Sequence, residues 1–172
     1  MNKKDPVTGD LISINLLEYA VIVVNYFISS FILKTNHSAL TKDPFPMLLN
    51  WADNQTAIAW TRKAASSNAS GKALSRLLCA ARINNPLGLT SDFIPGLSNE
   101  TADAISRIQH SPGSPPNFSH FKSQLPKLHS CRRFLLSSDF LSTLLRALLE
   151  GLEPGVEITE MPGQWQPDSD II

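Results

Sequence analysis

Two aspartates stand where a site for a divalent metal ion could form. Asp53 follows a short apolar stretch, Met47–Leu49, that is typical of a strand, and a helical pattern begins directly after it. Asp103 stands in the first turn of another expected helix, which follows a second strand and the Pro95-Gly96 turn. Side chains at the ends of elements can converge, and Mg²⁺ prefers carboxylate oxygens. The two aspartates therefore suggest a metal site, with simple capping of each helix as the alternative.

The elements that must position these side chains follow from the spacing of apolar residues. Helices are expected over 15–33, 54–62, 70–83 and 99–108, and strands over 45–51 and 89–94. The third of these helices carries an apolar stripe at the spacing of one helix face, which predicts a buried side: Leu74, Leu77, Leu78 and Ala81. This order of helices and strands predicts an α/β layered domain that spans residues 1–110.

Three further segments are expected beyond this domain. Residues 111–136 are rich in proline and serine near their start and predict a linker. Residues 137–152 predict an amphipathic helix, which either packs back on the domain or binds a partner. Residues 153–172 are dominated by Pro, Gly, Asp and Ser, and a disordered tail is expected there.

The apolar segment Tyr19–Leu33 allows two interpretations. It contains fifteen residues without a charge, whereas a helix needs about 20 apolar residues to span a bilayer. Asn25, Ser29 and Ser30 also lie inside it. A buried core helix is therefore favoured and no membrane partner is expected, while a small membrane-anchored protein is the less favoured alternative.

Composition limits the classes of function. The chain has 172 residues, of which fifteen are basic and fifteen acidic, so polyanion binding would need a local patch. Four basic residues on the middle helices could contact phosphates, or could form an ordinary solvated face: Arg62, Lys63, Lys72 and Arg76. Trp51 and Trp60 are expected in the core. The two cysteines, Cys79 and Cys131, lack zinc-site spacing and predict free thiols in an intracellular protein, nuclear or cytoplasmic.

Three segments in this order resemble the RNase H-like domain of retroelement reverse transcriptases. They are Ser13–Glu18, Ala52–Ala57 and Ile94–Arg107, and the similarity is greatest to fungal-type elements of the DIRS group. The segment Leu128–Phe134, with the helix after it, is similar to the tail that follows this domain in such sequences. The resemblance implies an RNase H-like mixed sheet flanked by helices, with a C-terminal helical tail.

The resemblance also implies roles for individual residues. RNase H enzymes use carboxylates to hold two Mg²⁺ ions, which activate water for cleavage of RNA in an RNA–DNA hybrid. By motif, Glu18, Asp53 and Asp103 correspond to three of these carboxylates, and they are the predicted catalytic and metal-binding residues. The implied partner is an RNA–DNA hybrid or another nucleic acid.

One departure from the family pattern changes the expected activity. The family has a further Asp on its first strand, but only seventeen residues precede Glu18 here, too few for the first strands of the sheet. Asp5 and Asp10 stand where the third strand should begin. The expectation is therefore a truncated domain, inactive or impaired, whose strand before Asp53 has an unpaired edge. The alternative is a non-catalytic module that binds nucleic acid or protein.

Overall fold

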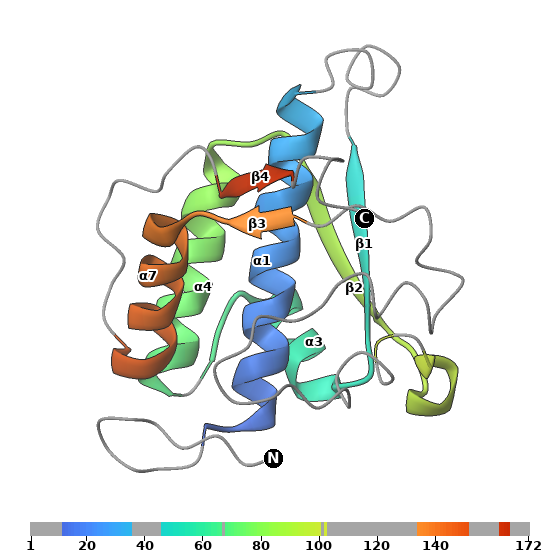
Figure 1. Ribbon diagram of the computed structural model, residues 1–172. Coiled ribbons are helices and arrows are strands. Elements are labelled where there is room, and N and C mark those ends of the chain that lie inside the picture. The colour runs from blue at the N-terminus through green and yellow to red at the C-terminus, as the bar shows by residue number, and fades with distance from the viewer. Residues whose placement is uncertain are drawn as a thin grey trace, which may run out of the picture.

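The computed structural model describes residues 12–35, 46–66, 68–100, 102, 134–151 and 162–165. In these ranges the chain is a mixed α/β protein with four α-helices and two small sheets (Figure 1). The order of its main elements is α1 (Ile14–Thr35), β1 (Met47–Ala52), α3 (Gln55–Lys63), α4 (Ala69–Ile83), β2 (Gly88–Phe93), β3 (Phe134–Leu136), α7 (Ser138–Leu145) and β4 (Gly163–Trp165). The elements predicted up to residue 94 are thus confirmed to within two residues at each end. The helix expected at 99–108 lies almost entirely outside the described residues.

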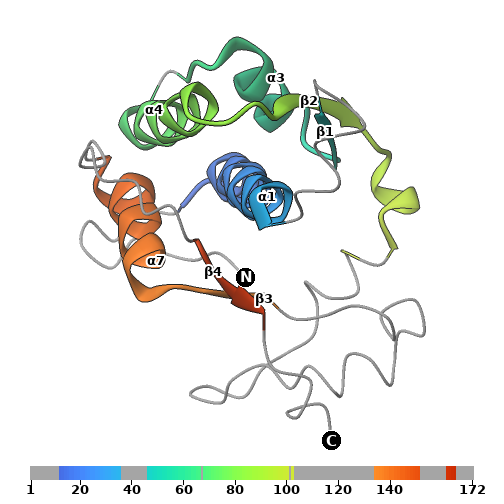
Figure 2. The ribbon, with the colours of Figure 1, turned by 90° about the horizontal axis from the view of Figure 1, so that it is seen from above.

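Helix α1 runs through the centre of the molecule. Seen from above, α3, α4 and the β1–β2 sheet cover one side of it, and α7 with the β3–β4 sheet lies on the other (Figure 2). Its apolar side chains form much of the core, among them Tyr19, Ile22, Val23 and Tyr26. The Tyr26 hydroxyl donates to the Leu87 carbonyl at 2.9 Å.

The packing of α1 bears on the two interpretations of its sequence. By length and composition α1 could cross a membrane, and 44% of its most apolar window is buried inside the protein. Its contacts with other elements favour the core-helix interpretation. The helix is not buried on every side, because Val21 is 56% exposed.

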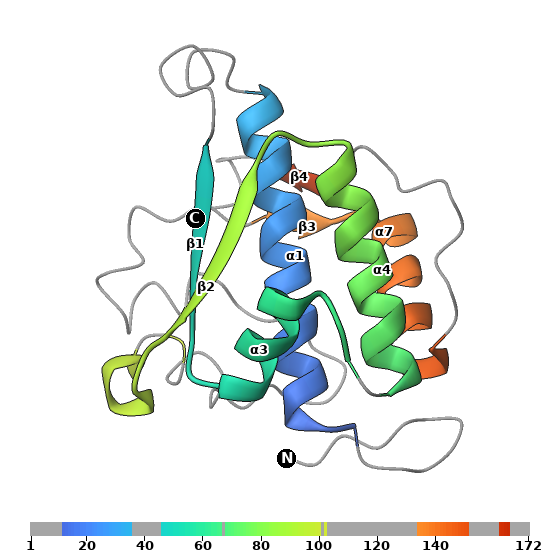
Figure 3. The ribbon, with the colours of Figure 1, turned by 180° about the vertical axis from the view of Figure 1, so that it is seen from behind.

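Strands β1 and β2 pair in parallel, with Asn50 opposite Ser91 and Ala52 opposite Phe93 (Figure 3). Alternate residues of β1 turn inward, and the buried Asn50 accepts a hydrogen bond from Asn25 of α1 at 3.0 Å. The expectation that Trp51 lies in the core is wrong: it is 56% exposed on the opposite face of β1. Within the described residues, no strand pairs with the second edge of β1.

Asparagine caps begin the two middle helices. Asn54 Oδ1 accepts from the Ala57 amide at 3.0 Å, and Asn68 Oδ1 accepts from the Gly71 amide, so α4 begins at Ala69, one residue before the predicted start. The predicted apolar stripe of α4 is buried as expected. Trp60 packs edge-on against Tyr19, with ring centroids 5.7 Å apart, which confirms its place beside the core.

The C-terminal helix packs back on the domain. Helix α7 continues as a π-helical turn, η3 (Arg146–Glu150), which lies against α4. Phe140 is buried against Phe27 of α1, with ring centroids 4.8 Å apart. Of the two alternatives for residues 137–152, the structure therefore supports packing on the domain.

Two short strands overlap segments for which no structure was predicted. Strand β3 occupies the end of the predicted linker 111–136, and β4 lies inside the predicted disordered tail 153–172. They pair antiparallel, and the rings of Phe134 and Trp165 meet edge-on at 5.0 Å. The aromatic contact between strands far apart in sequence explains why local composition did not predict them. At these residues the predictions of linker and disorder are wrong.

Candidate functional site

The N-terminal end of α1 and the C-terminal end of β1 lie at the same end of the molecule (Figure 1). A hydrogen bond joins them, because Asn54 Nδ2, directly after β1, donates to Asn15 Oδ1 of α1 at 2.8 Å. Glu18 is one turn further along α1, and Asp53 stands between β1 and the Asn54 cap. Local helix capping and strand alternation thus bring two of the predicted carboxylates to one place.

The electrostatics of Glu18 show that these carboxylates interact. Partial burial raises the pKa of Glu18 above its ordinary value, and the negative charge of Asp53 raises this pKa further. Asp53 itself is exposed. A cation beside both side chains would favour the ionised form of Glu18 and offset the repulsion from Asp53.

The turn that follows β2 reaches the same place. The 3-10 helix η1 (Gly96–Ser98) begins at Gly96, where a Cβ atom would lie 3.8 Å from Asp53 Oδ2. The Pro95-Gly96 turn, which was singled out in the sequence, therefore lies beside Asp53. Asp103, a few residues beyond this turn, lies outside the described residues.

The carboxylates of Glu18 and Asp53 suit one divalent cation that prefers oxygen ligands. Within the described ranges, no three His, Cys, Asp or Glu side chains gather into a group that could hold a metal ion. Glu18 and Asp53 could hold one Mg²⁺ ion that keeps several of its waters, as Mg²⁺ commonly does. Two carboxylates alone do not fit a centre for two metal ions.

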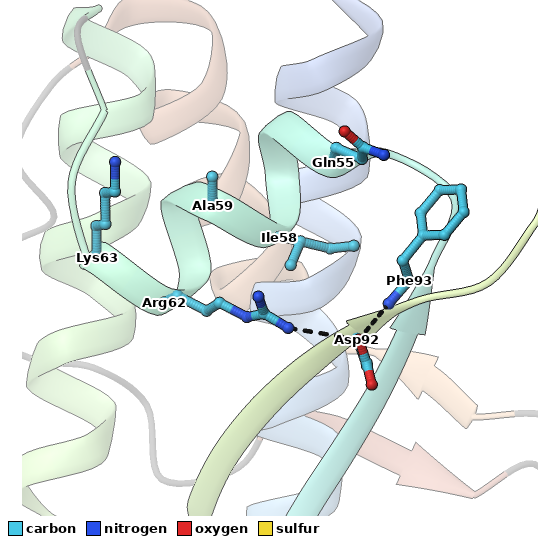
Figure 4. A pocket seen from close by; sticks show the side chains of 7 residues that line it. All are labelled: Gln55, Ile58, Ala59, Arg62, Lys63, Asp92 and Phe93. Atoms are coloured by element: carbon cyan, nitrogen blue, oxygen red, sulfur yellow. Dashed lines mark hydrogen bonds and ion pairs between the residues drawn. The ribbon is translucent and has the colours of Figure 1, made fainter.

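The structure divides the four predicted basic residues into two pairs. Arg62 and Lys63 line a pocket of about 440 Å³ between α3 and the end of β2 (Figure 4). Lys72 and Arg76 line a separate pocket of about 270 Å³, between α4 and the loop that precedes it. Neither pocket includes members of both pairs.

Arg62 has a structural role that the sequence did not suggest. Its Nε and Nη2 atoms donate to the Ser91 carbonyl at 3.1 and 2.8 Å, and Nη2 lies 3.4 Å from Asp92 Oδ1. The ion pair is exposed and contributes about 0–1 kcal/mol. The bonds to Ser91 fix the guanidinium against β2, and thereby join α3 to the sheet.

The 440 Å³ pocket contains residues that sequence reasoning did not select. They are Gln55 at the start of α3, and Asp92 and Phe93 at the end of β2. These elements meet only in the folded chain, so residue spacing carried no signal for them.

Comparison with models of known protein families, with curated proteins and with solved structures finds no match to this chain.

Proposed function

We propose that this chain is an RNase H-like domain of retroelement type that keeps part of a metal-dependent nuclease centre. By descent it is an endonuclease for RNA–DNA hybrids, and its hydrolysis is impaired or lost. The observation that carries this proposal is the 2.8 Å hydrogen bond from Asn54 to Asn15, which joins the end of β1 to the start of α1 and so brings Asp53 near Glu18. The sequence resemblance assigns metal-binding roles to the same two residues.

The arrangement of elements also supports the proposal. A long helix, a strand followed directly by Asp53, two helices and a parallel strand follow one another in the order that the resemblance implies. The second edge of β1, which has no strand beside it in the described ranges, is where the family places its first strand. That strand normally carries a further metal-binding Asp.

The proposed impairment rests on the carboxylates that the described residues bring together. The chemistry supplied by Mg²⁺ at such a site is activation of a water molecule and stabilisation of the leaving oxygen. Glu18 and Asp53 would hold and orient one hydrated ion beside a phosphate group. A centre for two metal ions needs more carboxylates than the described residues bring together.

A non-catalytic nucleic-acid-binding module is the second candidate. It is favoured by the exposed Lys63 and Lys72, whose charges are available to phosphates in two separate pockets. Such binding would weaken with salt and would not depend on the carboxylates.

Hybrid binding with and without Mg²⁺ distinguishes the two candidates. We expect the wild type to bind a labelled RNA–DNA hybrid more tightly in Mg²⁺ than in EDTA at equal ionic strength. This gain should disappear in Asp53→Asn and in Glu18→Gln. A gain of equal size in the wild type and both variants would contradict the proposal and support the binding module. Any slow cleavage must also disappear in Asp53→Asn, and cleavage that survives this substitution would count against the proposed site.

A further inference from the structure

The pocket between α3 and the end of β2 combines an exposed aromatic ring with two cationic side chains. It is lined by Phe93, Arg62 and Lys63, together with Gln55, Ile58, Ala59 and Asp92. We propose that this pocket binds a phosphorylated nucleoside within single-stranded nucleic acid, with the base against Phe93 and a neighbouring phosphate at Lys63 and Arg62.

The shape of the pocket suits this ligand. Figure 4 shows Gln55 and Phe93 at one end and Lys63 at the other, with Arg62 and Asp92 between them. From Gln55 to Lys63 the helix rises roughly 12 Å, which matches about three stacked nucleotides at roughly 3.4 Å each. The volume of about 440 Å³ lies within the range of small-ligand pockets. One nucleotide can therefore occupy the pocket while the strand continues along α3.

Phe93 provides the stacking surface. This residue is 41% exposed although it ends a strand in which Ser91 is fully buried. The Phe93 amide donates to Asp92 Oδ1 at 2.8 Å, which fixes the backbone at this end of β2. Stacking on an aromatic ring accepts any base, because every base has a π-face. The expected binding is therefore tolerant of sequence.

The side chains of Arg62 and Lys63 would bind the phosphate in different ways. Arg62 is held by the Ser91 carbonyl through Nε and Nη2, so within the described part of the chain its Nη1 amino group is left for a ligand. A guanidinium that is already fixed loses little conformational entropy on binding. Lys63 is exposed and can follow a phosphate. Asp92 opposes an anion, but its pairing with Arg62 offsets part of this charge and directs the phosphate towards Lys63.

This inference rests on the proposed function only in taking nucleic acid as the ligand. The pocket does not include Glu18 or Asp53, so binding in it should survive in EDTA and in Asp53→Asn. A phosphopeptide could use the same cations, but the open ring of Phe93 favours a nucleobase. The same chemistry could serve a free nucleotide, and the test separates that source from a strand.

The test measures the binding of a labelled single-stranded oligonucleotide by fluorescence anisotropy, in EDTA and at low salt. Phe93→Leu keeps apolar bulk but removes the ring plane, and we expect it to weaken binding about fivefold or more. Lys63→Gln should weaken binding and lower the salt slope by about 0.7. Lys34→Gln, an exposed lysine in the last turn of α1, is the matched control and should bind as the wild type does.

The outcomes separate the ligand sources. Tighter binding of the oligonucleotide than of a nucleoside monophosphate supports the strand, and equal binding supports the pocket but assigns it to free nucleotides. Oligonucleotide affinity unchanged in Phe93→Leu, in a variant whose thermal unfolding matches the wild type, would overturn the inference. Tighter binding of a phosphopeptide than of the oligonucleotide would overturn it as well. The pocket assignment and the proposed function can fail separately. If oligonucleotide binding does not depend on Phe93 but the hybrid still binds more tightly in Mg²⁺ than in EDTA, only the pocket assignment is refuted.

Discussion

Replacing each of the two buried tyrosines of α1 with phenylalanine tests whether this helix belongs to the core, and hence whether Glu18 is held near Asp53. The Tyr26 hydroxyl donates to the Leu87 carbonyl, and both residues are buried. Tyr26→Phe leaves this carbonyl without the donor, so the expected loss of unfolding free energy is about 1–3 kcal/mol.

Tyr19→Phe should cost less, and the reason lies in its partner. Ser75 Oγ donates its only proton to the Gly71 carbonyl at 2.8 Å, so Tyr19 is the donor in the 2.9 Å bond between the two hydroxyls. Removal of the Tyr19 hydroxyl therefore leaves no unpaired donor. The expected cost is about 0.5–1.5 kcal/mol, the usual net value of one hydrogen bond.

The assay is urea unfolding of the protein purified without detergent, followed by tryptophan fluorescence. Val21→Ala on the exposed side of α1 is the control, with an expected change within about 0.5 kcal/mol. A Tyr26→Phe variant no less stable than Val21→Ala would refute the packing of α1 against Leu87. A larger loss in Tyr19→Phe than in Tyr26→Phe would refute the assignment of donors.

Two further predictions concern Glu18 and the C-terminal helix. Because burial and Asp53 raise the pKa of Glu18 above its ordinary value of 4.5, the folded state holds this proton more tightly than the unfolded state. The contribution of Glu18 to stability should therefore fall as the pH rises from 4.5 through the raised pKa. Glu18→Gln should stabilise the protein at pH 7 but not below pH 4.5, and equal effects at both pH values in urea unfolding would contradict this. Phe140→Ala empties a buried site beside Phe27 and should cost about 3–5 kcal/mol; a loss under about 1 kcal/mol would show that α7 does not pack on α1.

The sequence predicted those elements that have a local signal. Helix α1 is a long apolar run, and the apolar stripe of α4 has clear periodicity. The exposure of Trp51 was not predictable, because apolar residues stand on both faces of β1 and the polar Asn50 beside Trp51 is the one that turns inward. Strands β3 and β4 have three residues each and depend on a pairing between distant segments.

The candidate site was only partly accessible from sequence. Asp53 was selected from its place after an apolar strand and Glu18 through the resemblance, and their interaction depends on the antiparallel course of α1 beside β1. The division of the basic residues into two pockets depends on how α3 and α4 turn relative to each other. Phe93 was expected as an ordinary strand residue, and its exposure follows from its place at the open end of the sheet.

The central claim is that Glu18 and Asp53 form one cation site, and paramagnetic broadening by Mn²⁺ in place of Mg²⁺ tests it most directly. In amide NMR spectra, we expect selective broadening of Glu18, Asn54 and Gly96, and no effect at Gly88, the far end of β2. This broadening should disappear in Asp53→Asn. Broadening that is centred elsewhere, or that is unchanged in Asp53→Asn, would contradict the claim.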